Sequence, residues 1–451
     1  EGLDADRLHV DGDLSCSSLK ADGDISLVGA RVGGVAKFDG ATLGQGLDAD
    51  RLKVDGDFSC ERGFTSKGNV QLRGARIGGD MIFRSANMAA GFNASGAKIE
   101  GDLHCSQDFK AEGAVQLLDA HISGIASFGG ATLAHGLSAD RLQIERSLFC
   151  RGAFKTEGDL NLLSARIGGD VQMRGELNGL IDLTGTNIVG ELQFDQGDGL
   201  VPTWGKAARL ILRNVSCDAL AGAISSFERK GAKGKVEYVP VELLGFSYAK
   251  IGGLTGGGET KAATLADANA RELIKFLQSD APKRGAFSPQ PYRQLANALM
   301  DAGQEVKANK IRFALFEHER AAAGVPASRK FVLFLSRLFI GHGFANWRAA
   351  LGFGLVVLGS AAAGLAFEGR PFAPATPDWK AMADWGGFAL GNSIPLVELD
   401  PHHSHFLDDR FAAGIPDYVK TSLYSAKLLG FVLLSYLAAG LSGFASRSAR
   451  G

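Results

Sequence analysis

A histidine-rich stretch near the C-terminus has the residue types that bind metal ions. His402, His403 and His405 lie close to Asp408 in the sequence HHSHFLDD. Imidazole and carboxylate groups form a ligand set that suits Zn or Cu, and short His-rich tracts bind such ions. A surface loop can also collect these residues without binding a metal. These four residues are therefore candidate metal ligands, with an ordinary polar loop as the alternative.

Four further residues of this region could line a pore, namely Ser393, Pro395, Glu398 and Asp400. They lie in or beside segment 385–399, which is too short to cross a membrane and too apolar for a free loop, so we expect a re-entrant segment or an interfacial helix. If several copies of the chain assembled around a re-entrant segment, Glu398 and Asp400 would form an acidic ring that favours cations. The Thr-Val-Gly-Tyr-Gly filter of cation channels does not occur.

The cysteines could in principle do redox chemistry or bind metal, but their spacing indicates a structural role. Cys16, Cys60, Cys105 and Cys150 recur every 44 to 45 residues, and no Cys-x-x-Cys motif occurs. If the chain forms stacked coils, these thiols lie two coils or about 10 Å apart, which exceeds the roughly 7 Å limit for a disulfide. We therefore predict that they are small core residues. Cys217 lies outside the repeat.

The sequence predicts no catalytic residue and no cofactor. A Gly-x-Gly-x-x-Gly motif between a strand and a helix is absent, and the Gly-rich GGLTGGGET lacks the Gly-Lys-Ser/Thr ending of a phosphate loop. The formal net charge of -1, with dispersed Lys and Arg, lacks the basic surface that nucleic acid requires. We therefore expect no nucleic-acid partner.

A long internal repeat must position most of these residues. GLDADRLHVDGDLSC, from Gly2, returns as GLDADRLKVDGDFSC from Gly46, and all 12 prolines lie after residue 200. Halving this period gives three apolar columns with steps of about 22 residues. The first column is Cys16, Phe38, Cys60, Phe83, Cys105, Phe128, Cys150, Met173 and Phe194. The second is Leu27, Ala49, Leu72, Ala94, Leu117, Ala139, Leu162 and Leu183. The third is Val32, Val54, Ile77, Ile99, Ile122, Ile144, Ile167 and Ile188.

The columns predict a mainly β fold, in which short strands stack into a four-faced β-helix with about 22 residues per coil. This β-helix covers 1–200, and because the chain begins in the middle of a repeat we expect it to be truncated at its N-terminus. Residues 201–258 are expected to supply the end strands and the cap of the β-helix. Such an end needs covering, because unpaired strands invite edge pairing.

A helical region, 259–324, follows the predicted cap. The pattern around Gly303 is typical of one tetratricopeptide-like helical hairpin. Such a hairpin could cap the β-helix or offer a groove to a protein partner.

The final region, 325–451, is predicted to be a membrane domain. Runs 349–367 and 428–444 are long and apolar enough to span a bilayer, and 330–341 has the pattern of an amphipathic surface helix. Arg and Lys precede the first span and Arg follows the second, so the positive-inside rule places the β-helix and both termini in the cytoplasm.

Four motifs resemble a family of bacterial proteins in which pentapeptide-like β-helical repeats precede a helical segment and two C-terminal transmembrane helices. These motifs are the GARIGGD repeats, LLGFSYAKI from Leu243, FSPQPYRQLANALMDAGQEVKANKI from Phe287 and GHGFANWRAALGF from Gly341. The resemblance covers nearly the full length and implies a right-handed coil and a location in the bacterial inner membrane. Many members are labelled membrane-associated oxidoreductases, but no residue here supports redox chemistry.

From these patterns we expect a non-enzymatic, membrane-anchored scaffold. Its expected partners are the lipid bilayer, further copies of itself and a protein bound to the β-helix or the helical hairpin. One alternative is a homo-oligomeric ion channel built on the span, re-entrant segment and span. A second is the oxidoreductase that the family label implies.

Overall fold

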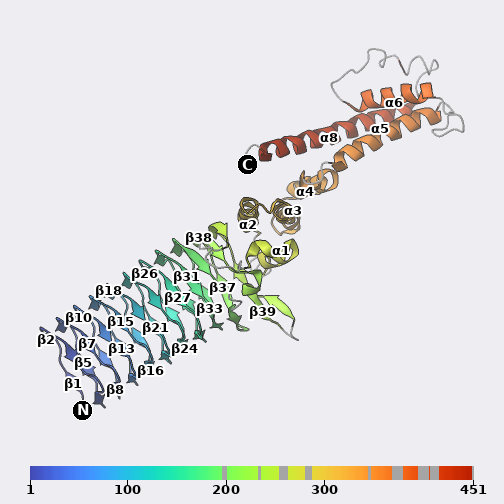
Figure 1. The fold of residues 1–451 in the computed structure, drawn as a ribbon. Coiled ribbons are helices and arrows are strands. Elements are labelled where there is room, and N and C mark those ends of the chain that lie inside the picture. Colours follow the sequence, from blue (N-terminus) through green and yellow to red (C-terminus); the bar gives the residue numbers. More distant parts are fainter. Residues whose placement is uncertain are drawn as a thin grey trace. The chain divides into compact units, whose positions relative to one another are not determined.

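The computed structural model divides into two compact units, Glu1–Arg312 and Phe313–Gly451. Figure 1 shows their elements. The described residues are 1–195, 201–231, 235–252, 263–279, 287–343, 347–367, 379–394, 406 and 416–448.

The first unit begins with a β-solenoid of about nine coils, with about 23 residues per turn where the sequence predicts about 22. Each coil contributes very short strands at four positions. One coil consists of β9 (Leu47–Asp48), β10 (Lys53–Val54), β11 (Phe58–Ser59) and β12 (Thr65–Ser66). Equivalent strands of successive coils pair in parallel, from β1 (Leu3–Asp4) to β35 (Glu191–Gln193), within sheets of 11, 20 and 9 strands.

The interior of the solenoid contains the three predicted columns. Every member after the first coil is at most 2% exposed, whereas Cys16, in the first coil, is partly exposed. Backbone hydrogen bonds between coils hold the columns in register; one example is the 2.7 Å bond from the Phe38 N–H to the Ser59 carbonyl. The predicted inward orientation of the columns is therefore confirmed.

A column of aspartates explains the recurring Gly-Gly-Asp turns. Oδ1 of Asp57 accepts the N–H of Asp80 at 2.8 Å, and Oδ1 of Asp80 accepts the N–H of Asp102 at 2.8 Å. The glycine before each aspartate leaves room for the carboxylate of the preceding coil, because a Cβ at Gly79 would lie 2.0 Å from Oδ1 of Asp57. We call this repeated pair of groups the Gly-Asp column.

The solenoid ends in a group of strands of two to six residues, and α2 (Gln290–Asp301) packs against the last of them. The end strands are β36 (Thr203–Trp204), β37 (Arg209–Ile211), β38 (Ser216–Ala221), β39 (Glu228–Lys230), β40 (Val236–Tyr238), β41 (Val241–Glu242) and β42 (Ser247–Ile251). Gln290 donates from Nε2 to the Phe246 carbonyl at 2.7 Å, and Gln294 donates to the Tyr248 carbonyl at 2.5 Å. The side-chain amides of α2 thus bind backbone groups of the edge that a further coil would otherwise occupy.

Removing these amides should weaken the end of the solenoid. In Gln290→Ala and Gln294→Ala, a partly buried carbonyl loses its donor, and we expect each change to lower the free energy of unfolding by about 1–2 kcal/mol. Hydrogen exchange of the β42 amides in the full chain would measure the effect. Arg293→Ala, on the exposed side of the same helix, serves as the control, and equal exchange in all three variants would contradict the capping role.

Helices α1 (Ala270–Leu277) and α3 (Glu305–Ala321) flank α2 in the sequence, and the boundary between the two units falls inside α3. Gly303, with a φ of +73°, forms the turn between α2 and α3. The second unit also has the described helices α4 (Ala327–Ile340), α5 (Trp347–Phe367), α6 (Trp379–Ser393) and α8 (Asp417–Ser448). Within α5 and α8, the stretches Trp347–Ala366 and Asp417–Ala438 are long and apolar enough to cross a membrane.

Candidate functional site

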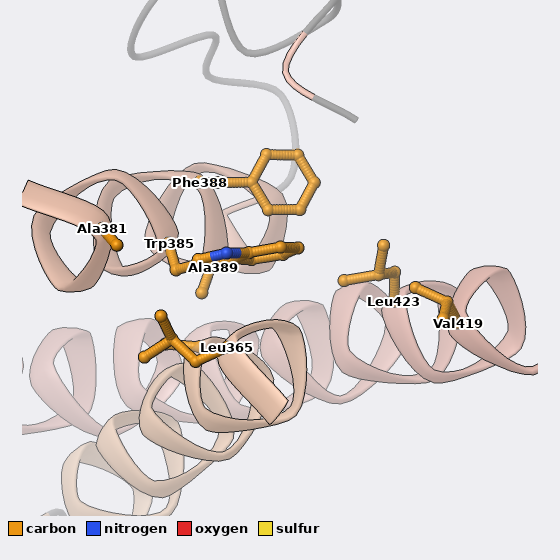
Figure 2. Packing of buried hydrophobic residues seen from close by; sticks show 8 residues of the cluster. Leu365, Ala381, Trp385, Phe388, Ala389, Val419 and Leu423 are labelled. Atoms are coloured by element: carbon orange, nitrogen blue, oxygen red, sulfur yellow. The ribbon is translucent and has the colours of Figure 1, made fainter. Parts of the chain in front are cut away.

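The second unit has a core built around Trp385 of α6, where α5, α6 and α8 meet (Figure 2). The indole is completely buried and contacts the rings of Phe388 and Phe406 edge-on, with centroids 5.9 and 5.0 Å away. The other buried members of the core are Ala361, Leu365, Ala381, Ala389, Val419 and Leu423. Trp385 therefore holds α6 against the two long apolar helices.

Two glycines let α6 approach its neighbours closely. A Cβ at Gly364 of α5 would lie 2.1 Å from the Trp385 ring, and a Cβ at Gly430 of α8 would lie 2.2 Å from the Ser393 carbonyl oxygen. Asn392 also donates from Nδ2 to the Leu423 carbonyl at 3.0 Å. Small residues allow this kind of close backbone packing between helices in an apolar environment.

These contacts place the end of α6 well inside the apolar pair formed by α5 and α8. Gly352 of α5 lies level with Leu433 of α8, since a Cβ at Gly352 would be 3.4 Å from a Leu433 methyl group. With about 1.5 Å of rise per residue, the Gly364 contact with Trp385 is about 18 Å along α5 from that level. The Ser393 contact at Gly430 is only about 5 Å from it. Helix α6 thus runs inward along the pair rather than across its end.

Of the candidate pore residues, only Ser393 lies within the described part of the chain. It is completely buried, and its Oγ has no hydrogen-bond partner among the described residues. Pro395, Glu398 and Asp400 lie outside the described residues. The structure therefore defines the helix that leads to the candidate pore segment, and the acidic ring stays a prediction.

The candidate metal ligands His402, His403, His405 and Asp408 also lie outside the described residues. Within the ranges that the structure describes, no group of three or more His, Cys, Asp or Glu is arranged to hold a metal ion. The predicted metal site is therefore untested.

A buried histidine that the sequence analysis did not single out lies between α4 and α5. The imidazole of His342 is 1% exposed and lies between the rings of Phe313 and Phe316, with centroids 5.2 and 5.1 Å away. Its backbone is left-handed, with a φ of +57°, which is uncommon for a residue other than glycine. The Gly-His-Gly sequence between two helical patterns was the signal that could have revealed this corner.

Glu317 of α3 anchors the corner. Its carboxylate lies 2.9 Å from Nε2 of His342, 3.0 Å from Nη1 of Arg337 and 3.2 Å from Nη2 of Arg320. Burial acts to raise the pKa of Glu317, but the hydrogen bonds and positive charges of these partners outweigh it and lower the pKa. The carboxylate therefore stays ionised. It connects α3 to α4 through Arg337, and to the turn before α5 through His342.

The outer surface of the solenoid is polar and has ion pairs between neighbouring coils. Arg73 pairs with Asp50, and Arg141 pairs with Asp119, in both cases at 2.5 Å. Because Asp119 and Arg141 are 22 residues apart, this pair joins two neighbouring coils. These exposed pairs are screened by solvent and form a solvated face rather than a reactive site.

The repeat cysteines are core residues, as the column pattern predicts. Cys60, Cys105 and Cys150 are buried and free, and no two cysteines form a disulfide among the described residues. Burial raises the pKa of all three thiols, to about 12 for Cys150. A thiol held neutral in this way is a poor nucleophile and a poor metal ligand.

Thiol labelling should therefore report solenoid unfolding. At a pH near 8, we expect Cys60, Cys105 and Cys150 to react with a thiol reagent only after denaturant is added. Because the folded-state pKa is raised, the free energy of unfolding should be highest below about pH 8.5 and fall as the pH rises toward 12. Replacing all three residues with Ala should reduce this slope, and rapid labelling of the native protein would contradict the prediction.

No family model, curated protein or solved structure matches this chain. The resemblance to bacterial membrane proteins with β-helical repeats, and the oxidoreductase label of that family, therefore stay predictions from the sequence motifs.

Proposed function

We propose that the protein is a non-enzymatic scaffold, a four-faced β-helix tethered to a membrane by α5 and α8. The observation that supports this function is the division of side chains in the solenoid. The interior columns are closed and apolar, while the outside carries exposed ion pairs such as Arg73 with Asp50. Such a solenoid offers an extended polar surface to a protein partner or to a second copy of the chain.

The membrane part of this proposal rests on α5 and α8. Their large apolar side chains point outward: Leu351, Leu355 and Leu358 are each more than half exposed, as is Leu428. Such an apolar surface is costly in water and favourable in a bilayer. Together with the positive-inside pattern and the family resemblance, it supports an inner membrane location in bacteria with the β-helix in the cytoplasm.

Membrane extraction tests the anchor. The full chain, expressed in bacteria, should stay in the membrane pellet after alkaline carbonate treatment and dissolve in mild detergent. In inside-out vesicles, added protease should digest the solenoid, whereas in right-side-out vesicles it should be protected. Release by carbonate would contradict anchoring, and the reverse protease pattern would contradict the proposed orientation.

A homo-oligomeric ion channel is the second candidate, and the inward course of α6 favours it. Helix α6 ends at Ser393 beside Gly430, within the apolar stretch of α8, as expected of a helix that leads into a re-entrant segment. The non-helical backbone of a re-entrant segment is tolerated inside a membrane only beside protein or a water-filled cavity.

Planar-bilayer recording distinguishes the two candidates. A channel predicts discrete cation currents from the purified protein and a several-fold lower conductance in Glu398→Gln, since the acidic ring would lose its charge. Glu305→Gln, at the exposed start of α3, is the control and should conduct normally. The absence of currents from a protein that remains oligomeric and folded would contradict the channel.

A further inference from the structure

Helix α4 carries an apolar stripe on its exposed side. Phe331, Phe334 and Leu338 are 61%, 48% and 54% exposed, and their spacing of three and four residues places them on one face. Leu333 points the other way and is 3% exposed. Three large apolar side chains on one free face of a short helix are unusual in a protein surrounded by water.

Basic side chains lie beside this stripe, and only some of them form ion pairs within the described residues. Arg329 pairs with Glu319 at 2.9 Å and Arg337 pairs with Glu317 at 3.0 Å. Lys330 has no ion pair within the described part of the chain, and residues 327–367 contain no Asp or Glu at all. The face of α4 therefore combines exposed apolar groups with a net positive charge.

Helix α4 also lies beside one end of the α5 and α8 pair. The ring of Phe339 contacts that of Tyr436 in α8, with centroids 5.6 Å apart. Trp347, at the start of α5, is 64% exposed, and the Arg348 guanidinium lies 5.9 Å from its ring centroid. Trp and Tyr gather where membrane-spanning helices meet the headgroups, so these aromatic residues mark the level at which α4 lies.

We infer that α4 lies in the membrane surface, with Phe331, Phe334 and Leu338 among the upper acyl chains and Lys330 against the headgroups of anionic lipids. This inference rests on the proposed membrane anchor and adds to it a binding surface and its ligand. The stripe exposes large apolar side chains, as the leucines of α5 do. The positive charge of α4 attracts anionic lipids and repels a second copy of the same surface. Because Glu317 and Glu319 hold the two arginines toward α3, lipid contact leaves the ion pairs intact.

Depth-dependent fluorescence quenching in the full chain tests this inference. Phe334→Cys in a Cys16→Ala background would be labelled with an environment-sensitive dye and reconstituted in vesicles of phosphatidylcholine, with or without phosphatidylglycerol. Lipids with a doxyl quencher near the headgroup should quench this dye more than lipids with the quencher deep in the bilayer. A dye at Leu355→Cys, in the middle of α5, should show the opposite order, and one at the exposed Lys67→Cys of the solenoid should be quenched by neither.

Lys330→Ala tests the headgroup contact. In vesicles that contain phosphatidylglycerol, we expect Lys330→Ala to lower the ratio of docked to undocked α4 about five-fold, as measured by shallow quenching at position 334. Lys67→Ala should leave this ratio unchanged.

Each contrary result overturns a specific part of the inference. Deep quenching at position 355 without any quenching at 334 would overturn the lipid contact of α4 while the anchor stands, including the case in which another protein copy covers the stripe. Quenching at 334 that is equal in both lipids would overturn the recognition of anionic headgroups. No quenching at either position would overturn the membrane anchor itself.

Discussion

Replacing Phe83 with alanine is expected to destabilise the solenoid by about 3–5 kcal/mol. The Phe83 ring is completely buried and contacts those of Phe58, Phe92 and Phe109, with centroids 6.1, 4.9 and 6.3 Å away. Its removal leaves a cavity that the hydrogen-bonded coils on either side cannot collapse to fill.

Urea unfolding of the full chain in mild detergent, followed by labelling of the buried thiols, would measure this loss in the solenoid alone. Phe149→Ala is the matched control, because that ring is only half-buried and lies against Arg151 on the outer surface. We expect the control to lose about 1 kcal/mol or less. Similar losses in both variants would mean that the Phe83 column does not stabilise the stack.

Trp385→Ala is expected to release α6 from α5 and α8, with a loss of about 3–5 kcal/mol in the stability of the second unit. The indole fills the space over Gly364, where no side chain is available to replace it. Trp385→Phe should cost less, because it keeps an aromatic ring there and removes an indole N–H that is buried without a partner among the described residues.

The matched control is Trp379→Ala, in the same helix, whose side chain is 70% exposed. Unfolding in mixed detergent micelles, followed by far-ultraviolet circular dichroism, would compare the three variants. Limited proteolysis would show whether cleavage after Lys380 increases in Trp385→Ala alone. Equal behaviour of Trp379→Ala and Trp385→Ala would contradict the role of the buried indole.

The solenoid could be predicted from the sequence because its geometry repeats. An apolar residue recurs at the same position of the Phe83 column in every coil. A single apolar residue that occurs by chance therefore does not change the predicted fold. The exception, Cys16, is partly exposed. The same periodicity does not reveal which side-chain amides bind the last edge, since Gln290 and Gln294 occur in a helix outside the repeat.

The second unit was less predictable because its contacts join residues that have no period in common. Apolar composition identifies α5 and α8, but the seating of Trp385 on Gly364 depends on tertiary packing. The sequence also left open whether segment 385–399 is re-entrant or interfacial, and both stay predictions, since a contact such as that of Ser393 with Gly430 has no signature in the sequence. His342 was missed because a single histidine between two helices has no chemical signature until its partner Glu317 is known.

The Gly-Asp column makes the coils interchangeable in a way that bears on how such a chain can change its size. Each turn accepts a carboxylate from the preceding coil and passes an equivalent one to the next. A gene duplication of one whole coil, about 22 residues, would therefore insert a unit that fits at both joints, and the stack would lengthen in increments of about 4.8 Å. Steps of 21, 22 and 23 residues between coils all keep this contact, so a one-residue change is absorbed within a coil, whereas reach changes only by whole coils.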